Sequence, residues 1–125
     1  MEGDLFFASR IISVLEKAGH TVKAVRTREA AETEIAADRP DLVILNLASP
    51  ALGRADLIRH VKSASPGTRV IAFLSHMKLP EVRDEMIAAG VDRLCANSAI
   101  TMRLPDIVRD TVAGSGAGSG VVEED

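Results

Sequence analysis

Polar side chains follow two short apolar runs in the chain, at the points where each run ends. Asn46 closes the run 41–46 (DLVILN), and Ser75 and His76 come directly after the run 69–74 (RVIAFL). Short runs rich in Val and Ile predict strands that are buried on both faces of a sheet. In parallel sheets, ligands and reactive groups gather just beyond the carboxyl ends of such strands. These three residues are therefore the first to test for chemistry.

Their types make a poor catalytic set. Ser75 and His76 are adjacent, so on a strand their side chains would point to opposite faces, and no acid is placed to orient the histidine. The amide of Asn46 is a very poor nucleophile, and we expect it either to bind a ligand or to hydrogen-bond a neighbouring loop. Cys95 is the only cysteine. It excludes an internal disulfide and is interpreted as a small buried apolar residue.

Apolar spacing divides the chain into alternating helices and strands. Helices are predicted at 5–18, at 27–39, around 57–61, at 79–89 and from Pro105 onward, and strands at 21–25, 41–46, 69–74 and 91–95. Strands that alternate with helices in this way predict an α/β fold with a parallel sheet wrapped by helices on both faces. We expect the strand 41–46 to lie in the middle of that sheet, because its apolar run is continuous.

The chain closes with a change of composition. Residues 114–120 (GSGAGSG) have the composition of a flexible linker, and an acidic segment, 121–125 (VVEED), follows them. We therefore expect one domain over residues 1–112 and a linker with a disordered acidic tail over 113–125. The glycines follow a helix rather than a strand, so they do not fit a phosphate-binding loop.

Composition limits the classes of partner. The 125 residues carry a formal net charge of −3, with Lys and Arg scattered along the chain, and the aromatic residues are three phenylalanines. Neither a basic surface nor stacking platforms are expected, so nucleic acid is not predicted as a direct partner. No apolar run approaches the ~18–20 residues that span a membrane, and no leader sequence opens the chain. Together with a single cysteine, this favours a cytoplasmic protein.

Four features of the sequence resemble the receiver domain of two-component response regulators. They are the strand DLVILN with a proline four residues after Asn46, the strand VIAFLS ending in Ser75, the run AAGVDRLCAN before and through Asn97, and the spacing of the helices between them. The resemblance covers roughly residues 4–112 and implies a flavodoxin-like, doubly wound parallel sheet.

The resemblance also assigns the positions of the family's phosphorylation site. The phosphoacceptor aspartate falls on Asn46, the acidic pair that holds Mg²⁺ on Gly3 and Asp4, the hydroxyl position on Ser75, and the lysine on Asn97. The switch aromatic falls on Leu94. Asp4 is a weak metal candidate and is better suited to cap a helix. We therefore expect a degenerate pseudo-receiver without phosphoryl transfer, catalytic residues, a bound metal or a cofactor.

The family's first strand, which lies in the centre of its sheet, has no counterpart before Asp4. The resemblance therefore implies either that this strand is missing or that the tail 121–125 takes its place in the centre of the sheet. We expect the first strand to be missing and the tail to be disordered, because the two valines of the tail would bury little area in the sheet.

A domain without phosphoryl chemistry is expected to act in signal transduction through protein–protein contact. The resemblance implies a partner protein or a second copy bound through the last helix and the neighbouring loops. Met77, Leu79, Ile100 and Met102 are apolar residues near that edge, and they either support such a contact or cap the core. The alternative function is a small-ligand-binding or enzymatic α/β domain that uses the carboxyl ends of the strands. Asp41 or Asp92 could be a substitute phosphoacceptor, but both are predicted near strand starts, far from that edge.

Overall fold

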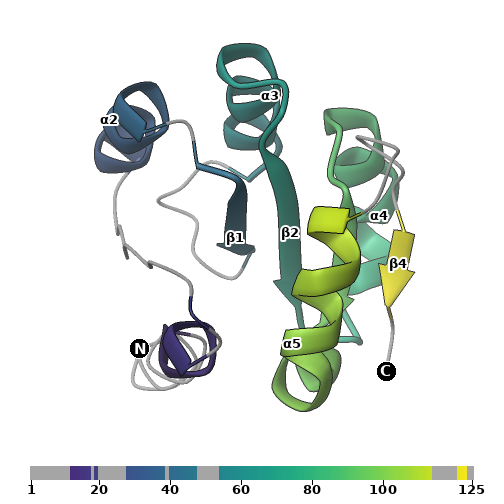
Figure 1. Cartoon of the computed structure of the whole chain (residues 1–125). Helices are drawn as coiled ribbons and strands as arrows, with labels where there is room; N and C mark the ends of the chain where they lie inside the picture. The colour runs from purple at the N-terminus through teal and green to yellow at the C-terminus, as the bar shows by residue number, and fades with distance from the viewer. Residues whose placement is uncertain are drawn as a thin grey trace.

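The computed structural model describes residues 12–17, 19, 28–38, 40–47, 54–113 and 121–123. Its strands are β1 (Leu42–Asn46), β2 (Arg69–Leu74), β3 (Arg93–Ala96) and β4 (Val121–Glu123). They pair in the order β1-β2-β3-β4, and each pair is parallel. Figure 1 shows β1 beside β2, with β4 on the far side of β2 from β1. The predicted parallel sheet is confirmed.

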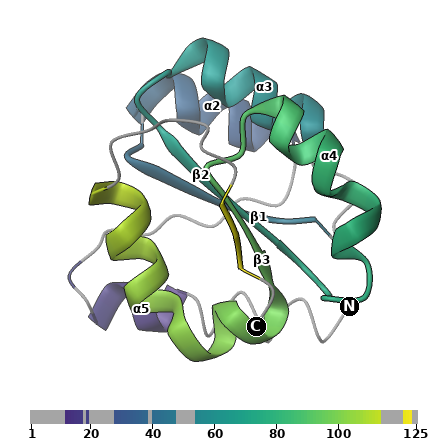
Figure 2. The ribbon, with the colours of Figure 1, turned by 90° about the vertical axis from the view of Figure 1, so that its right-hand side faces the viewer.

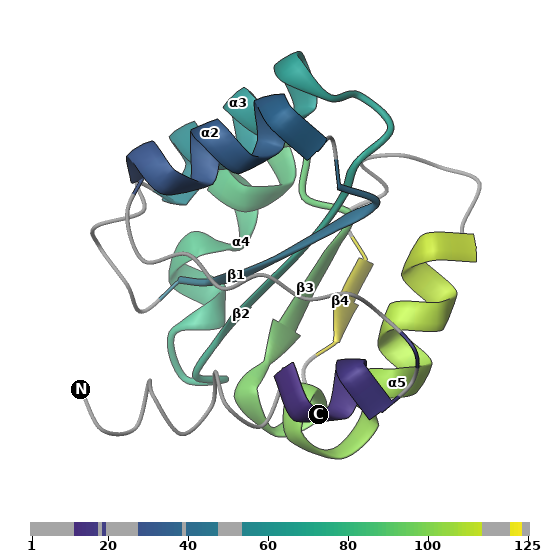
Figure 3. The same ribbon diagram turned by 60° about the vertical axis from the view of Figure 1, so that its left-hand side comes forward.

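Helices cover both faces of this sheet. α2 (Arg28–Asp38), α3 (Arg54–Ala64) and α4 (Leu79–Ala89) lie on one face, and α5 (Asn97–Ala113) lies on the other together with the helical residues 12–17 (Figures 2 and 3). Because successive side chains of a strand point to opposite faces, β1, β2 and β3 each contribute side chains to the hydrophobic core on either face of the sheet. Leu45, Ala72 and Leu94 pack under α2, α3 and α4, whereas Ile71 and Cys95 pack under α5. The predicted doubly wound α/β class is confirmed, as is the burial of Cys95.

Among the described strands, β2 and β3 each have a strand on both sides, and β2 is more buried than β1. Residues from Val70 to Leu74 are all buried, whereas β1 has only Leu45 buried and its other residues half-buried. Within the described ranges, β1 pairs on one side alone, with β2. The predicted strand 41–46 is confirmed, and its predicted place in the middle of the sheet depends on residues outside the described ranges. The predicted strand 21–25 lies outside the described residues.

Helix α4 follows its sequence closely. Its apolar positions Leu79, Val82, Met86 and Ala89 are buried, and a proline stands in its first turn, where the missing N–H costs nothing. The helix ends at Gly90, which adopts a left-handed conformation with φ of 103°. The Gly90 N–H donates to the Ile87 carbonyl and the Val91 N–H to the Met86 carbonyl, so the last turn keeps its hydrogen bonds.

Replacing Gly90 by alanine is expected to lower the free energy of unfolding by about 1–2 kcal/mol, because a residue with a Cβ is strained in the left-handed region. The added Cβ would also lie 3.3 Å from the Lys62 Cγ. Gly67→Ala is the matched control, since a Cβ there meets nothing within 4 Å and its φ is not positive. Urea unfolding followed by circular dichroism measures both. Equal stability of the two variants would show that the conformation of Gly90 is not needed.

Helix α5 begins earlier than predicted. The proline at position 105 was expected to start it, but the helical segment starts at Asn97 and contains Pro105. The two parts are joined at Arg103, whose φ of −131° and ψ of 23° are not helical. Proline cannot donate a backbone hydrogen bond to the preceding turn, and its ring clashes with the carbonyl four residues earlier, so the helix is interrupted in the turn before Pro105. The inward positions Ile107, Val108 and Thr111 are buried, as the spacing predicts.

The end of the chain forms a strand, contrary to the expected disordered tail. Val121–Glu123 pairs in parallel with β3, with Val121 opposite Arg93, Val122 opposite Leu94 and Glu123 opposite Cys95. This strand occupies the outer edge of the sheet beside β3 and not a slot beside β1. The alternative in which the tail replaces the central first strand is therefore also wrong.

Candidate functional site

The carboxyl ends of three strands meet at one edge of the sheet. Asn46 ends β1, Ser75 follows β2 directly, and Asn97 follows β3 directly. The register places Asn46 opposite Phe73, which is itself opposite Cys95. Ser75 and Asn97 therefore stand two positions further along their strands than Asn46 does along β1. This structure brings together three of the positions assigned from the receiver resemblance, and Gly3 and Asp4 lie outside the described residues.

Asn46 is half-buried at the last rung of β1. By the alternation of the strand it shares a face with Leu42 and Ile44, which pack in the core under α5. The next residue, Leu47, is completely buried, and its N–H donates to the Phe73 carbonyl at 3.0 Å. This holds the end of β1 against β2. The side chain of Asn46 is an amide, which can form hydrogen bonds but has no charge and is a very poor nucleophile.

Ser75 begins the turn that leads into α4. Its carbonyl accepts hydrogen bonds from the N–H groups of Lys78 and Leu79, at 3.0 and 3.2 Å, and its side chain is half-buried. His76 is exposed on the turn itself. The two side chains therefore differ in environment.

Asn97 begins α5 directly after β3. The Asn97 backbone carbonyl accepts a hydrogen bond from the Thr101 hydroxyl at 2.9 Å. Its side-chain Oδ1 is buried and has no hydrogen-bond partner in the part of the chain that the structure describes. A buried acceptor without a donor costs about 1–3 kcal/mol and, as the negative end of a dipole, does not attract an anion. The residue that the receiver resemblance aligns with the family's lysine thus presents a neutral amide.

The described residues also hold no metal site. Across the described ranges, no three His, Cys, Asp or Glu side chains come together in a way that could bind a metal ion. Leu94, at the position of the family's switch aromatic, is fully buried in the core on the α4 face of the sheet. Of the four apolar residues singled out near this edge, Leu79 and Ile100 belong to the core, whereas Met77 and Met102 are 78% and 80% exposed.

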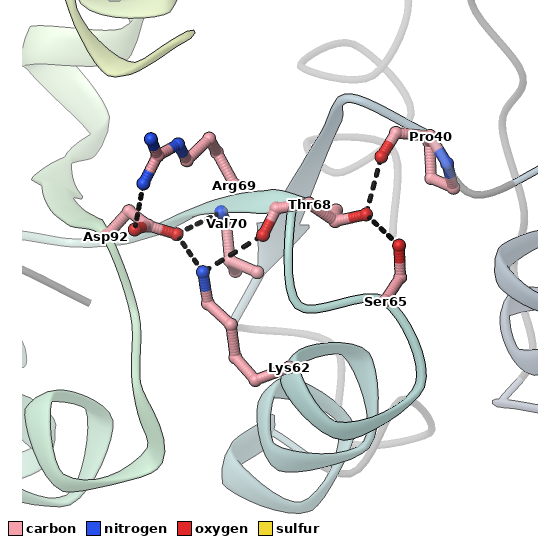
Figure 4. A network of polar contacts seen from close by, with 7 residues as sticks. All are labelled: Pro40, Lys62, Ser65, Thr68, Arg69, Val70 and Asp92. Carbon is pink, nitrogen blue, oxygen red and sulfur yellow. Dashed lines mark hydrogen bonds and ion pairs between the residues drawn. The ribbon is translucent and has the colours of Figure 1, made fainter. Parts of the chain in front are cut away.

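A polar network that sequence reasoning missed lies at the opposite, amino-terminal edge of the sheet (Figure 4). Asp92, just before β3, has a side chain only 3% exposed. The Lys62 Nζ donates to Asp92 Oδ2 at 2.5 Å and to the Thr68 carbonyl at 2.9 Å, and the Val70 N–H donates to Asp92 Oδ2 at 2.7 Å. Arg69 adds a longer ion pair of 3.6 Å to Asp92 Oδ1. Asp92 therefore joins α3, β2 and β3.

The same network extends toward β1. The Thr68 hydroxyl donates to the Pro40 carbonyl at 2.5 Å, and the hydroxyls of Ser65 and Thr68 lie 2.7 Å apart. Asp92 lies at the amino-terminal edge of the sheet, whereas Asn46 lies at the carboxyl edge. This agrees with the prediction that Asp92 lies near the start of a strand. Its carboxylate is committed to cations and a backbone N–H, which suits a structural role rather than that of a substitute phosphoacceptor.

The chain is similar to a solved structure and to a curated protein. A response regulator of Burkholderia pseudomallei, whose crystal structure holds a phosphorylated aspartic acid, a calcium ion and citrate, superposes with a TM-score of 0.68 over 87% of this chain and 61% of that chain, at 17% sequence identity. The fold is that of a receiver domain. At this identity the likeness concerns the receiver-like architecture alone.

The second similarity is to a protein of another kind. Aluminum-activated malate transporter 1 of Triticum aestivum is 31% identical over 106 residues, which make up 84% of this chain and 22% of the transporter. The chain thus spans less than a quarter of the transporter's length. No protein-family model matches the receiver-like chain. In the described residues, no helix combines the length and the apolar character that crossing a bilayer requires.

Proposed function

We propose that this chain is a degenerate receiver-like module that acts in signal transduction by protein–protein contact, without aspartyl phosphorylation and without catalysing a reaction. The observation that carries the proposal is the pair of amides at the carboxyl edge. Asn46 stands at the end of β1 and Asn97 at the start of α5, where the receiver pattern has an aspartate and a lysine. The module would work in the cytoplasm and would not bind nucleic acid directly.

The chemistry of phosphoryl transfer supports this proposal. A carboxylate oxygen can attack phosphorus to form an acyl phosphate, whereas an amide cannot do so at a useful rate. The similar response regulator holds a phosphorylated aspartic acid. A transferred phosphoryl group also needs positive charge to stabilise it, and Asn97 offers a buried oxygen instead. The module would therefore need neither Mg²⁺ nor another cofactor.

The surface proposed for contact is formed by the exposed side of α5 and the loops at the carboxyl edge. Met102 lies in the first part of α5, and Met77 in the turn between β2 and α4. Both side chains are largely exposed, and methionine adapts well to varied partner surfaces. We take a second copy of this chain as the first partner to test. The similarity to a malate transporter supports no different proposal, because it involves 22% of that protein.

Replacing Met102 by glutamate is expected to weaken self-association at least about tenfold, because a charge must then be desolvated in the contact. Sedimentation equilibrium measures the dissociation constant. Ile87→Glu is the matched control, since Ile87 is the third exposed large apolar side chain of the described residues and lies near the end of α4, toward the other edge of the sheet. A strictly monomeric chain, or equal weakening by both substitutions, would contradict self-association through this surface.

A further inference from the structure

The strand β4 lies at the end of the described sheet, beside β3. It runs along the outer edge of β3, between α4 and α5 in the view of Figure 2. The paired segment comes from beyond the end of α5 at Ala113, so the end of this chain returns to cover an edge of its own sheet.

The edge that β4 covers is suited to receive a strand. β3 pairs with β2 on its inner side through four rungs, from Arg93 to Ala96. Without β4, the backbone N–H and C=O groups along its outer side would have no strand partner, and such a row of groups is a template for another extended segment. The Leu94, Cys95 and Ala96 side chains of β3 are fully buried, so this strand is fixed in the core and does not have to form on binding.

The covering strand is short and is joined to the domain by a tether. β4 has three residues, and three rungs join it to β3. Seven residues, 114–120, connect Ala113 to Val121, and their composition is that of a flexible linker. Seven residues reach at most about 23–25 Å. A tether of this kind holds the strand at an effective concentration of about millimolar, which keeps it paired although the contact itself is small.

We infer that the outer edge of β3 is a binding site for an extended peptide strand and that β4 occupies it as a displaceable cover. The ligand is a partner's segment that pairs in parallel with Arg93–Ala96, and its sequence type is that of the present occupant, two apolar residues followed by an acidic one. The inference rests on the proposed contact function for its use in the cell, because it names the outer edge of β3 as a place where a partner's segment would bind.

The test uses the full chain with its tail unable to pair. Proline lacks a backbone N–H and disrupts a ladder, so Val121→Pro/Val122→Pro should release β4 and leave the other described elements unchanged. Amide hydrogen exchange by NMR then reports on Arg93–Ala96. We expect exchange on the outer side of β3 to rise by roughly tenfold or more in the variant. A synthetic peptide of residues 117–125 at about millimolar concentration should restore protection in the variant and should leave the wild-type chain unchanged.

A peptide that carries the same two prolines is the control and should not restore protection. The inference is overturned if the variant and the wild-type chain exchange alike, because β4 would then not cover the edge. It is also overturned if the peptide fails to protect the variant, or protects both chains equally, because the edge of β3 would then not be the site. None of these results depends on self-association or phosphoryl transfer, so failure here is distinguishable from failure of the proposed function.

Discussion

Replacing Asp92 by alanine is expected to lower the free energy of unfolding by about 3–5 kcal/mol, the cost of breaking a buried ion pair from one side. The substitution leaves the Lys62 ammonium group, whose side chain is 17% exposed, without its carboxylate. It also removes the acceptor of the Val70 N–H at the start of β2. The loss is large because one carboxylate satisfies groups from two other elements at once.

Urea unfolding followed by circular dichroism is the suitable measurement, since the chain has no tryptophan or tyrosine to report by fluorescence. Asp56→Ala is the matched control. Asp56 is 76% exposed and pairs with Arg59 three residues away, so its loss should change stability by no more than about 0.5 kcal/mol. Asp92→Asn should fall between the two, because the amide keeps an acceptor for Val70 but not the charge. Similar values for Asp92→Ala and Asp56→Ala would contradict the structural role of Asp92.

Replacing Phe73 by alanine is expected to cost about 3–5 kcal/mol, the range for removing a large buried aromatic side chain. Phe73 is 4% exposed and packs on the α5 face of the sheet together with Ile71 and Cys95. Phe73 lies on β2, opposite Asn46 of β1 on one side and Cys95 of β3 on the other. A cavity at this position would loosen both neighbours at the carboxyl edge.

Phe73→Leu is the control, because it keeps most of the apolar volume and should cost less than about 1.5 kcal/mol. The same urea experiment measures both variants. NMR of the alanine variant should in addition show shifted amide signals at Asn46 and Leu47, whose N–H donates to the Phe73 carbonyl. If alanine and leucine were equally tolerated, Phe73 would not be a principal part of this core.

The sequence predicts those parts of the fold that depend on local pattern. The burial of Val82, Met86 and Ala89 follows from helical spacing, and the end of α4 follows from Gly90. The strands β1 and β2 follow from short Val- and Ile-rich runs, and their parallel arrangement follows from the helices between them. Each of these features is set by residues close together in the chain, so periodicity and capping are sufficient to find it.

Features that depend on distant residues were missed. Lys62 and Asp92 are 30 positions apart, and no local signal links them. The pairing of 121–123 with β3 depends on an open sheet edge, which the composition of the tail does not reveal. Similarly, the continuous apolar run of β1 predicted burial on both faces, whereas only Leu45 of this strand is buried among the described residues. The burial of a strand depends on the elements packed around it, which its own residues do not specify.

The candidate site shows the same division between local and distant information. Its place at the carboxyl edge follows from the order of strands and helices, and the residue assignments follow from the receiver resemblance. The buried Oδ1 of Asn97 could not be predicted, because its environment is built by packing around the start of α5. Similarly, the sequence named four apolar residues near the edge but could not separate the exposed Met77 and Met102 from the buried Leu79 and Ile100.

The most direct test of the central claim is a phosphorylation assay at the carboxyl edge. The purified chain and its Asn46→Asp variant are incubated with acetyl phosphate and Mg²⁺, and the intact mass is then measured. We predict no phosphoryl adduct on either protein, because the variant restores a carboxylate but leaves Asn97 without positive charge. A stable, Mg²⁺-dependent phosphoryl adduct on the wild-type chain, mapped to the ends of β1, β2 or β3, would contradict the account.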